Sequence, residues 1–119
     1  MDNEREDELN REHAAVFAAF SDPTRLRLVK ILAGQTQGST LCVNALAGIL
    51  GISQSAVSQH LRMLKGLNLV KGDRQGYRVH YEINQEAFDH IREMMTDALS
   101  GTDIHCTECQ HGDKDISKN

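Results

Sequence analysis

The sequence contains few aromatic residues and a single proline. Only 4% of its 119 residues are aromatic, and Trp is absent. The hydrophobic core must therefore be aliphatic, a composition that favours packed helices. One proline together with 25% charged residues argues against a low-complexity or disordered chain. We expect one domain, because a chain of this size buries roughly two thirds of its unfolded surface in one core and leaves no room for a second full domain.

Long apolar runs and an even set of cysteines are also missing. No stretch approaches the roughly 18 apolar residues of a membrane-spanning helix, and the N-terminus is acidic, unlike a secretion signal. Three cysteines are an odd and small number for a secreted domain held by disulfides. We therefore expect a soluble, cytoplasmic protein with reduced thiols and no membrane partner.

The charge is distributed unevenly along the chain, whose net charge is -4. Residues 1–12 hold six acidic residues against two arginines, a local charge of -4. Residues 84–119 hold eight acidic residues against three basic ones, which gives -5. Residues 53–80 hold five basic residues against Asp73 alone, which gives +4. An acidic protein with a basic middle can present one face to a polyanion, so the middle segment is the candidate functional region.

Hydrophobic residues spaced three and four apart predict amphipathic helices on both sides of this segment. Asp22 is a good N-cap for one of them, and Pro23 suits its first position, where a missing N–H costs nothing. Asn84 can cap the last helix. The predicted helices cover about residues 9–20, 23–33 and 85–99. The chain is expected to divide into an acidic arm at residues 1–8, a folded domain at 9–99 and a polar tail at 100–119.

The middle of the chain predicts two short helices followed by a hairpin. Apolar residues predict a helix over residues 41–50, closed by Gly51. Ser53 is a strong N-cap for the next helix, residues 54–65. The hydrophobic period then changes from about 3.6 to 2, which predicts two strands around a basic turn. These strands lie at residues 69–71 and 77–83.

This order of elements predicts a winged helix-turn-helix, a mainly α fold with a small β-hairpin. A helix of about 13 residues is roughly 20 Å long and suits the major groove, which is about 12 Å wide. Its polar face can hydrogen-bond to base edges or phosphates, and the hairpin arginines can reach the backbone or minor groove. His60 can contact either DNA or its own domain. The candidate DNA-binding residues are Gln54, Ser55, Ser58, Gln59, His60, Arg62, Arg74 and Arg78.

Three stretches of the chain carry specific motifs: SDPTRLR at residues 21–27, SQSAVSQHL at 53–61, and LV, RQG and Tyr81 within residues 69–81. They resemble the second helix, recognition helix and wing of the ArsR/SmtB family of metalloregulators. The resemblance covers about residues 9–99. The resemblance implies a homodimeric transcriptional repressor that leaves its double-stranded DNA operator when an inducer binds.

The resemblance also implies that the first and last helices form the dimer interface. Independently, the apolar faces of these helices hold more hydrophobic surface than so small a domain easily buries alone. The alternative is that Met94 and Met95 belong to the core of a monomer. We therefore predict that the first and last helices pack against those of a second copy through their apolar faces.

The resemblance leaves the inducer open, because family sensors bind ligands at several positions. In family sensors of the arsenic and cadmium type, the resemblance implies a Leu-Cys-Val-Cys motif at the start of the third helix. This chain has LCVN at residues 41–44, so it lacks the second cysteine and a two-thiol site there is excluded. The zinc type implies Asp, His or Glu ligands near both ends of the last helix. The matching positions here are Gln85, Ala87, Ala98 and Gly101, so that zinc site is absent.

The tail offers another set of ligands. Cys106 and Cys109 have the Cys-x-x-Cys spacing that binds one ion, and His105 and His111 could complete a tetrahedral zinc or cadmium site. Alternatively, Cys42 joins the two tail cysteines in a three-thiol arsenite site if the tail folds back. Cys42 can equally be a core residue. A regulator switched by thiol oxidation, and one without any inducer, remain open alternatives.

Two other classes of protein fit the sequence less well. The sequence has no phosphate-binding glycine loop and no Ser/His/Asp pattern, and its Cys-x-x-Cys lacks the strand and helix context of redox enzymes, so we expect no enzyme. A winged-helix module for protein contacts alone is the remaining alternative. Such a module would not need a polar helix face and a basic wing together.

Overall fold

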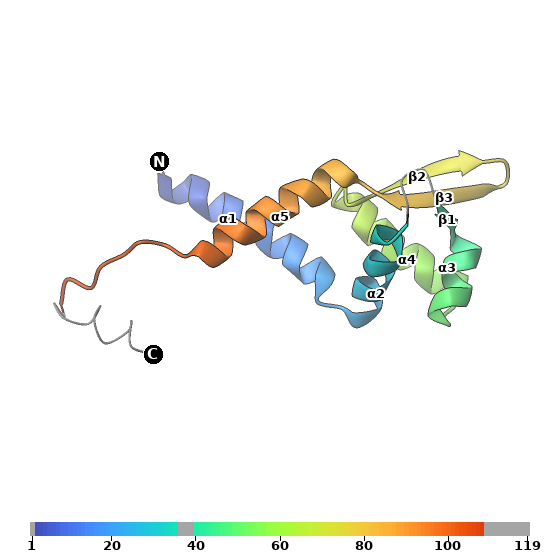
Figure 1. Ribbon diagram of the computed structural model, residues 1–119, viewed down its shortest axis with the longest axis horizontal. Coiled ribbons are helices and arrows are strands. Elements are labelled where there is room, and N and C mark those ends of the chain that lie inside the picture. The colour runs from blue at the N-terminus through green and yellow to red at the C-terminus, as the bar shows by residue number, and fades with distance from the viewer. Residues whose placement is uncertain (1, 36–39, 109–119) are drawn as a thin grey trace.

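The computed structural model describes residues 2–35 and 40–108. These residues form helices around one small antiparallel sheet, whose strand order is β1-β3-β2. The elements are α1 Asp2–Phe20, α2 Pro23–Ala33, β1 Leu41–Cys42, α3 Val43–Leu50, α4 Gln54–Gly66, β2 Val70–Gln75, β3 Arg78–Ile83 and α5 Gln85–Ser100. The β2–β3 hairpin projects from one end of the molecule, and α1 and α5 extend from the other (Figure 1). None of the described helices is long and apolar enough to cross a membrane.

The predicted helix caps are present. The Asp22 carboxylate accepts a hydrogen bond from the backbone N–H of Arg25 at 2.9 Å, and Pro23 occupies the first turn of α2. The Asn84 side chain accepts from the N–H of Ala87 at 3.4 Å at the start of α5. These side chains satisfy backbone donors that a helix leaves free at its N-terminus, which explains why both helices begin where the sequence predicts.

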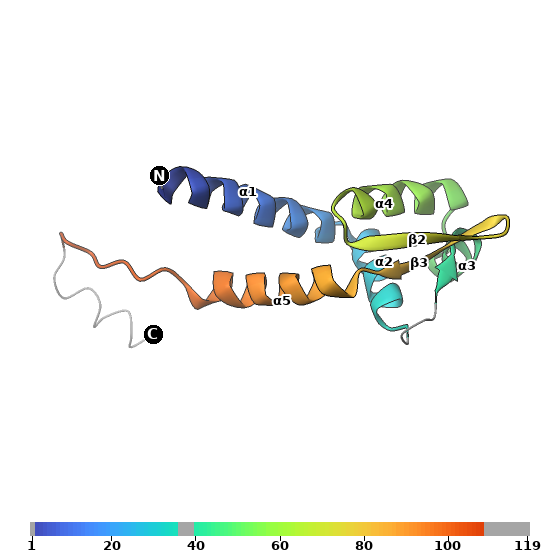
Figure 2. The same cartoon turned by 90° about the horizontal axis from the view of Figure 1, so that it is seen from above.

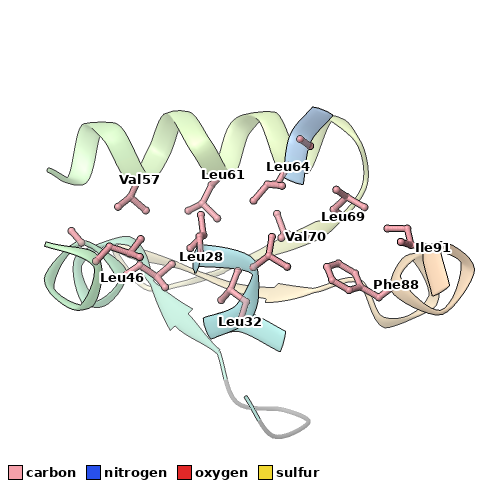
Figure 3. Packing of buried hydrophobic residues seen from close by; sticks show 14 of the residues in the cluster. Leu28, Leu32, Leu46, Val57, Leu61, Leu64, Leu69, Val70, Phe88 and Ile91 are labelled. Carbon is pink, nitrogen blue, oxygen red and sulfur yellow. The ribbon is translucent and has the colours of Figure 1, made fainter. Parts of the chain in front are cut away.

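The core is aliphatic, as the composition predicts. Leucines and valines from α2, α3, α4 and β2 meet between the helices and the sheet (Figure 3). Phe88 of α5 closes one side of this core, and its ring centre lies 6.3 Å from that of Phe20 at the end of α1. The largest fully buried side chains are Leu28, Leu32, Leu46, Leu61, Leu64, Leu69, Val57 and Val70.

Two predicted boundaries are wrong. Helix α1 begins at Asp2 and not near Leu9, so residues 2–8 continue the helix. Their Glu and Arg side chains are good helix formers, and acidic residues stabilise a helix N-terminus. The segment predicted as one helix over residues 41–50 instead starts with the strand β1. Leu41 pairs with Tyr81 and Cys42 with His80, because β3 offers this segment an unpaired edge.

The hairpin is longer than predicted and turns later. Strand β2 continues through residues 72–75, where the sequence predicted a loop, and the turn consists of Gly76 and Tyr77. Gly72 lies opposite Tyr81 in the register, and a Cβ atom on Gly72 would come within 2.9 Å of the Tyr81 ring. Gly72 therefore marks a close side-chain approach within a strand and not a turn.

Candidate nucleic-acid interface

Helix α4 is fixed to the domain by one buried stripe and one cap. Val57, Leu61 and Leu64 are at most 1% exposed and point into the core (Figure 3). The Ser53 hydroxyl accepts from the backbone N–H of Ala56 at 3.0 Å. Because these contacts hold one face of the helix, the opposite face must point outward. The exposed candidate residues on α4 are Gln54, Ser55, Gln59 and Arg62.

The turn between α3 and α4 depends on Gly51. Its φ of 70° lies in the left-handed region, and its N–H donates to the carbonyl of Ala47 at 2.8 Å. Glycine adopts this conformation without the strain that a Cβ atom causes. The chain thus reverses within three residues between two packed helices, which is the helix-turn-helix that the sequence predicts.

A cleft of about 490 Å³ lies where α3, α4 and the hairpin meet. The Gln54 amide donates to the side-chain carbonyl of Asn44 at 2.8 Å, which ties the start of α4 to the start of α3. Ser58, which is half-buried, and Arg78 line the same cleft. The structure therefore brings three predicted DNA-binding residues together and adds Asn44, which the sequence analysis missed. No local pattern marks Asn44, because its contact with Gln54 spans ten positions.

His60 of α4 is half-buried. The hydrogen bond from the backbone N–H of Arg25 lowers the pKa of the Asp22 carboxyl most, and the charges of Arg25 and His60 lower it further.

The two hairpin arginines are both exposed but lie on opposite faces of the ribbon. Arg74 is paired with Val79, and Arg78 is paired with Gln75. Successive side chains of a strand point to opposite faces, so this register separates the two guanidinium groups. Arg78 is the one that borders the cleft beside α4.

Cys42 is the last residue of β1 and the N-cap residue of α3. Its side chain is buried, with 8% exposure, and it makes no capping hydrogen bond. The nearby backbone N–H of Ala45 lowers the pKa of the thiol most, and the N–H of Asn44 and the charge of Arg78 add to this effect. The position at a helix N-terminus explains the direction, because the N–H groups there favour an anion.

The structure does not bring Cys42 and the tail together within one chain. Strand β1 lies beside the hairpin, whereas residues 101–108 leave the far end of α5 (Figure 2). Helix α5 has 16 residues and a length of about 24 Å, and it separates the two regions. In the described conformation α5 therefore lies between Cys42 and Cys106, and the three-thiol alternative still requires the tail to fold back.

The tail thiol that the structure describes is exposed. Cys106 follows His105, whose Nε2 lies 3.6 Å from the carboxylate of Asp103. Cys109 and His111 lie outside the described residues. Within residues 2–35 and 40–108, no group of three or more His, Cys, Asp and Glu side chains is arranged to hold a metal ion. The described residues alone thus do not supply the predicted zinc or cadmium site.

The terminal helices keep part of their apolar faces exposed. On α5, Ile91 and Met94 are buried, whereas Met95 is 38% exposed and Leu99 is 84% exposed. Phe17 on α1 is 40% exposed. The monomer-core alternative therefore holds for Met94 and not for Met95. A single chain leaves large hydrophobic side chains open on both helices that extend from the domain.

A helix-turn-helix with a polar outward helix and a cationic hairpin defines the class of winged-helix regulatory proteins. Residues 22–71 match the family model described as "Bacterial regulatory protein, arsR family". The chain is 40% identical over 91 residues to a protein from Synechocystis sp. named "Transcriptional repressor SmtB homolog". It is 34% identical over 86 residues to the "Cadmium resistance transcriptional regulatory protein CadC homolog" of Staphylococcus aureus. These matches cover 70% and 72% of this chain, and 66% of the length of each relative.

The "Arsenic resistance transcriptional regulator ArsR2" of Pseudomonas putida is 35% identical over 80 residues, and this match covers 67% of each chain. The chain therefore belongs to the ArsR family, which confirms the resemblance seen in the sequence. A homodimeric winged helix-turn-helix DNA-binding domain from Mycobacterium bovis, a possible ArsR-family regulator, has a similar solution structure with a TM-score of 0.63 and 25% identity. That similarity covers 86% of this chain and 92% of the other. The predicted fold class is confirmed, and the family is one of transcriptional regulators and not of enzymes.

Proposed function

We propose that the protein is a homodimeric repressor that binds a double-stranded DNA operator through α4 and the β2–β3 wing. One observation carries this proposal: the exposed polar face of α4 lies beside a cationic hairpin, in the only strongly basic segment of an acidic chain. The names of the two relatives, a repressor and a regulatory protein, support the same function.

The chemistry of the α4 face suits base recognition. Gln59 and Arg62 are exposed and carry amide and guanidinium groups that can bind base edges in the major groove. Arg74 and Arg78 on the wing supply charge for phosphates, which position a protein on DNA without reading its sequence. The cleft that contains Gln54, Ser58 and Arg78 provides polar donors where DNA would pass between helix and wing.

The first experiment measures binding to duplexes that the protein selects from a random library, over a range of salt concentrations. If about six to eight phosphates are neutralised, log K falls with log salt at a slope of roughly -5 to -7. Gln59→Ala and Ser58→Ala each lower discrimination against wrong bases by about 1 to 3 kcal/mol. Arg74→Ala weakens all duplexes alike and serves as the matched backbone-contact variant. A flat salt response, or equal affinity for random DNA, contradicts the proposal.

Homodimerisation is supported by the exposed apolar side chains of α1 and α5. Phe17, Met95 and Leu99 lie on helices that extend from the domain, and a single chain leaves them 40%, 38% and 84% exposed. The similar Mycobacterium bovis domain is homodimeric. A second copy of the chain is the proposed occupant of this surface, and it would place two α4 helices on one operator.

We further propose a soft metal or metalloid ion, of the zinc, cadmium or arsenite type, as the inducer that releases the operator. The Cys-x-x-Cys spacing of Cys106 and Cys109 and the exposed position of Cys106 support the tail as the sensor. The name of the Staphylococcus relative associates that protein with cadmium resistance. Because the tail follows α5 directly, a ligand there could act on the dimer interface; a coupling of about 1 to 3 kcal/mol is typical of such regulation.

The inducer proposal is tested by replacing Cys106 and Cys109 with Ser and titrating zinc, cadmium and arsenite against the operator complex. Operator affinity should stay intact while the response disappears. Cys42→Ser is the matched control, since Cys42 lies in β1, which pairs with the hairpin, and a tail-only site leaves the response of this variant unchanged. A lost response in Cys42→Ser supports the three-thiol site instead. A response that persists in the double variant shows that the tail is not the sensor, and a response only to oxidants supports thiol switching instead.

A further inference from the structure

Tyr77 forms the tip of the hairpin and is open to solvent on all sides. Its exposure is 102%, the highest among the exposed large hydrophobic residues of the described chain. The pairing of Gln75 with Arg78 leaves only Gly76 and Tyr77 in the turn, and Gly76 has a φ of 68°. Two-residue hairpin turns favour glycine with positive φ at this first central position, so the turn holds Tyr77 at a defined place.

Nothing in the fold accounts for an aromatic ring at this position. Turns of this kind ordinarily use Gly, Asn, Asp or Ser, and a ring without contacts adds no packing energy. The surroundings of Tyr77 suit a polyanion, because the cationic Arg78 follows it in the chain. Both residues border the same cleft as Gln54 and Ser58 of α4. DNA lying on α4 would therefore also meet the hairpin tip. The exposed cations of the hairpin are Lys71, Arg74 and Arg78.

We propose that Tyr77 inserts into the minor groove next to the major-groove segment that α4 reads, and that it selects A·T pairs there. This inference rests on the proposed function, because it assumes that α4 lies in the major groove. The minor groove is about 6 Å wide, so a flat ring enters it edge-on with its faces against the sugars. The phenolic hydroxyl donates to the acceptors of adenine or thymine, whereas a G·C pair places an amino donor on the groove floor.

The first test compares variants of the full chain on fluorescein-labelled duplexes that the wild type selects from a random library. Tyr77→Ala should bind about tenfold more weakly, from the lost ring contact and hydrogen bond. Its salt slope should equal that of the wild type, because Tyr displaces no counterion. Arg74→Ala is the matched control on the same hairpin, and its slope should be shallower by about 0.9.

Tyr77→Phe separates the ring from the hydroxyl. It should keep most of the affinity but lose the preference for A·T over G·C pairs at the positions under the wing. Library selection with this variant shows the loss directly. Selected sites in which those positions keep the wild-type A·T preference contradict the hydroxyl contact.

The composition of the chain allows a direct readout of Tyr77. The protein has no Trp and two tyrosines, so Tyr81→Phe leaves Tyr77 as the only strong intrinsic fluorophore. Acrylamide should quench this emission efficiently in the free protein and several-fold less in the duplex complex. The side chain of Tyr77 is fully exposed, so its substitution leaves the fold intact.

Wild-type affinity in Tyr77→Ala, together with unchanged quenching of Tyr77 on the duplex, overturns this inference and leaves the proposed function standing. Protection of Tyr77 that depends on protein concentration without DNA assigns the ring to a protein contact and also overturns it. Failure of the wild type to select any duplex refutes the proposed function first.

Discussion

Replacing Gly72 with Ala tests the packing inside the wing. A Cβ atom at this position would come within 2.9 Å of the Tyr81 ring and 3.0 Å of a Val79 methyl group. The backbone of Gly72 is outside the left-handed region, so alanine would stabilise the fold by about 0.4 to 1 kcal/mol through the unfolded chain alone. Overpacking costs about 1 to 3 kcal/mol and exceeds that gain. The net expectation is a loss of about 1 kcal/mol.

Gly48→Ala is the matched control, because it makes the same chemical change with the opposite expected sign. Gly48 lies in α3, and a Cβ atom there meets nothing within 4 Å. Alanine should stabilise this helix by about 0.5 to 1 kcal/mol. For a chain of this length, 1 kcal/mol corresponds to about 4 °C in Tm. The assay is thermal unfolding followed by circular dichroism at one fixed protein concentration, since dimerisation makes Tm depend on concentration.

A double variant identifies the source of the cost. Tyr81→Leu removes the ring atom nearest to Gly72, so Gly72→Ala should cost much less in that background. The reasoning is refuted if Gly72→Ala raises Tm as much as Gly48→Ala does, because the Tyr81 ring would then not occupy the space above Gly72.

Three further predictions follow from other parts of the molecule. Met95→Glu should give a folded monomer in sedimentation velocity at micromolar concentration. An unpaired charge buried in the dimer interface costs about 3 to 5 kcal/mol, whereas residue 95 is exposed in a single chain and tolerates the charge there. A dimer that persists would show that the interface lies elsewhere. Ser53→Ala removes the acceptor for the N–H of Ala56 and should cost about 1 kcal/mol in urea unfolding, and an unchanged midpoint contradicts the cap. Iodoacetamide should label Cys106 before Cys42 in native protein, because burial slows the reaction of the Cys42 thiol. Mass spectrometry of the peptides measures the two rates. Equal rates would show that the β1–α3 junction opens.

The sequence was informative wherever one local signal determined the structure. Asp22 with Pro23, and Ser53, mark helix starts because capping involves residues only a few positions apart. The start of α1 was missed because residues 2–8 contain no apolar residue for a periodic pattern to detect. Spacings such as Asp7 to Arg11 stabilise this helix by charge instead, and charge spacing alone is a weak signal.

The remaining errors come from contacts between distant segments. Strand β1 exists because Leu41 and Cys42 meet β3, about 40 positions away, and the hydrophobic pattern of a short apolar segment suits a helix equally well. Within the candidate site, Asn44 was missed for the same reason. Tyr77 was missed because the sequence placed the turn at residues 72–76 and Tyr77 in the following strand, and only the pairing of β2 with β3 puts Tyr77 in the turn.

The extension of α1 to Asp2 gives the molecule a large electric dipole moment. Residues 2–12 carry -4 and residues 84–108 carry -5, and α1 and α5 both extend away from the wing, whose surrounding segment carries +4 (Figure 1). In the field of DNA such a charge distribution turns the protein so that the wing arrives first. The acidic end is repelled, which disfavours binding lengthwise along an arbitrary sequence. In the proposed complex α1 and α5 lie farthest from the operator. Their acidic charge thereby favours the operator over arbitrary DNA sequences through repulsion.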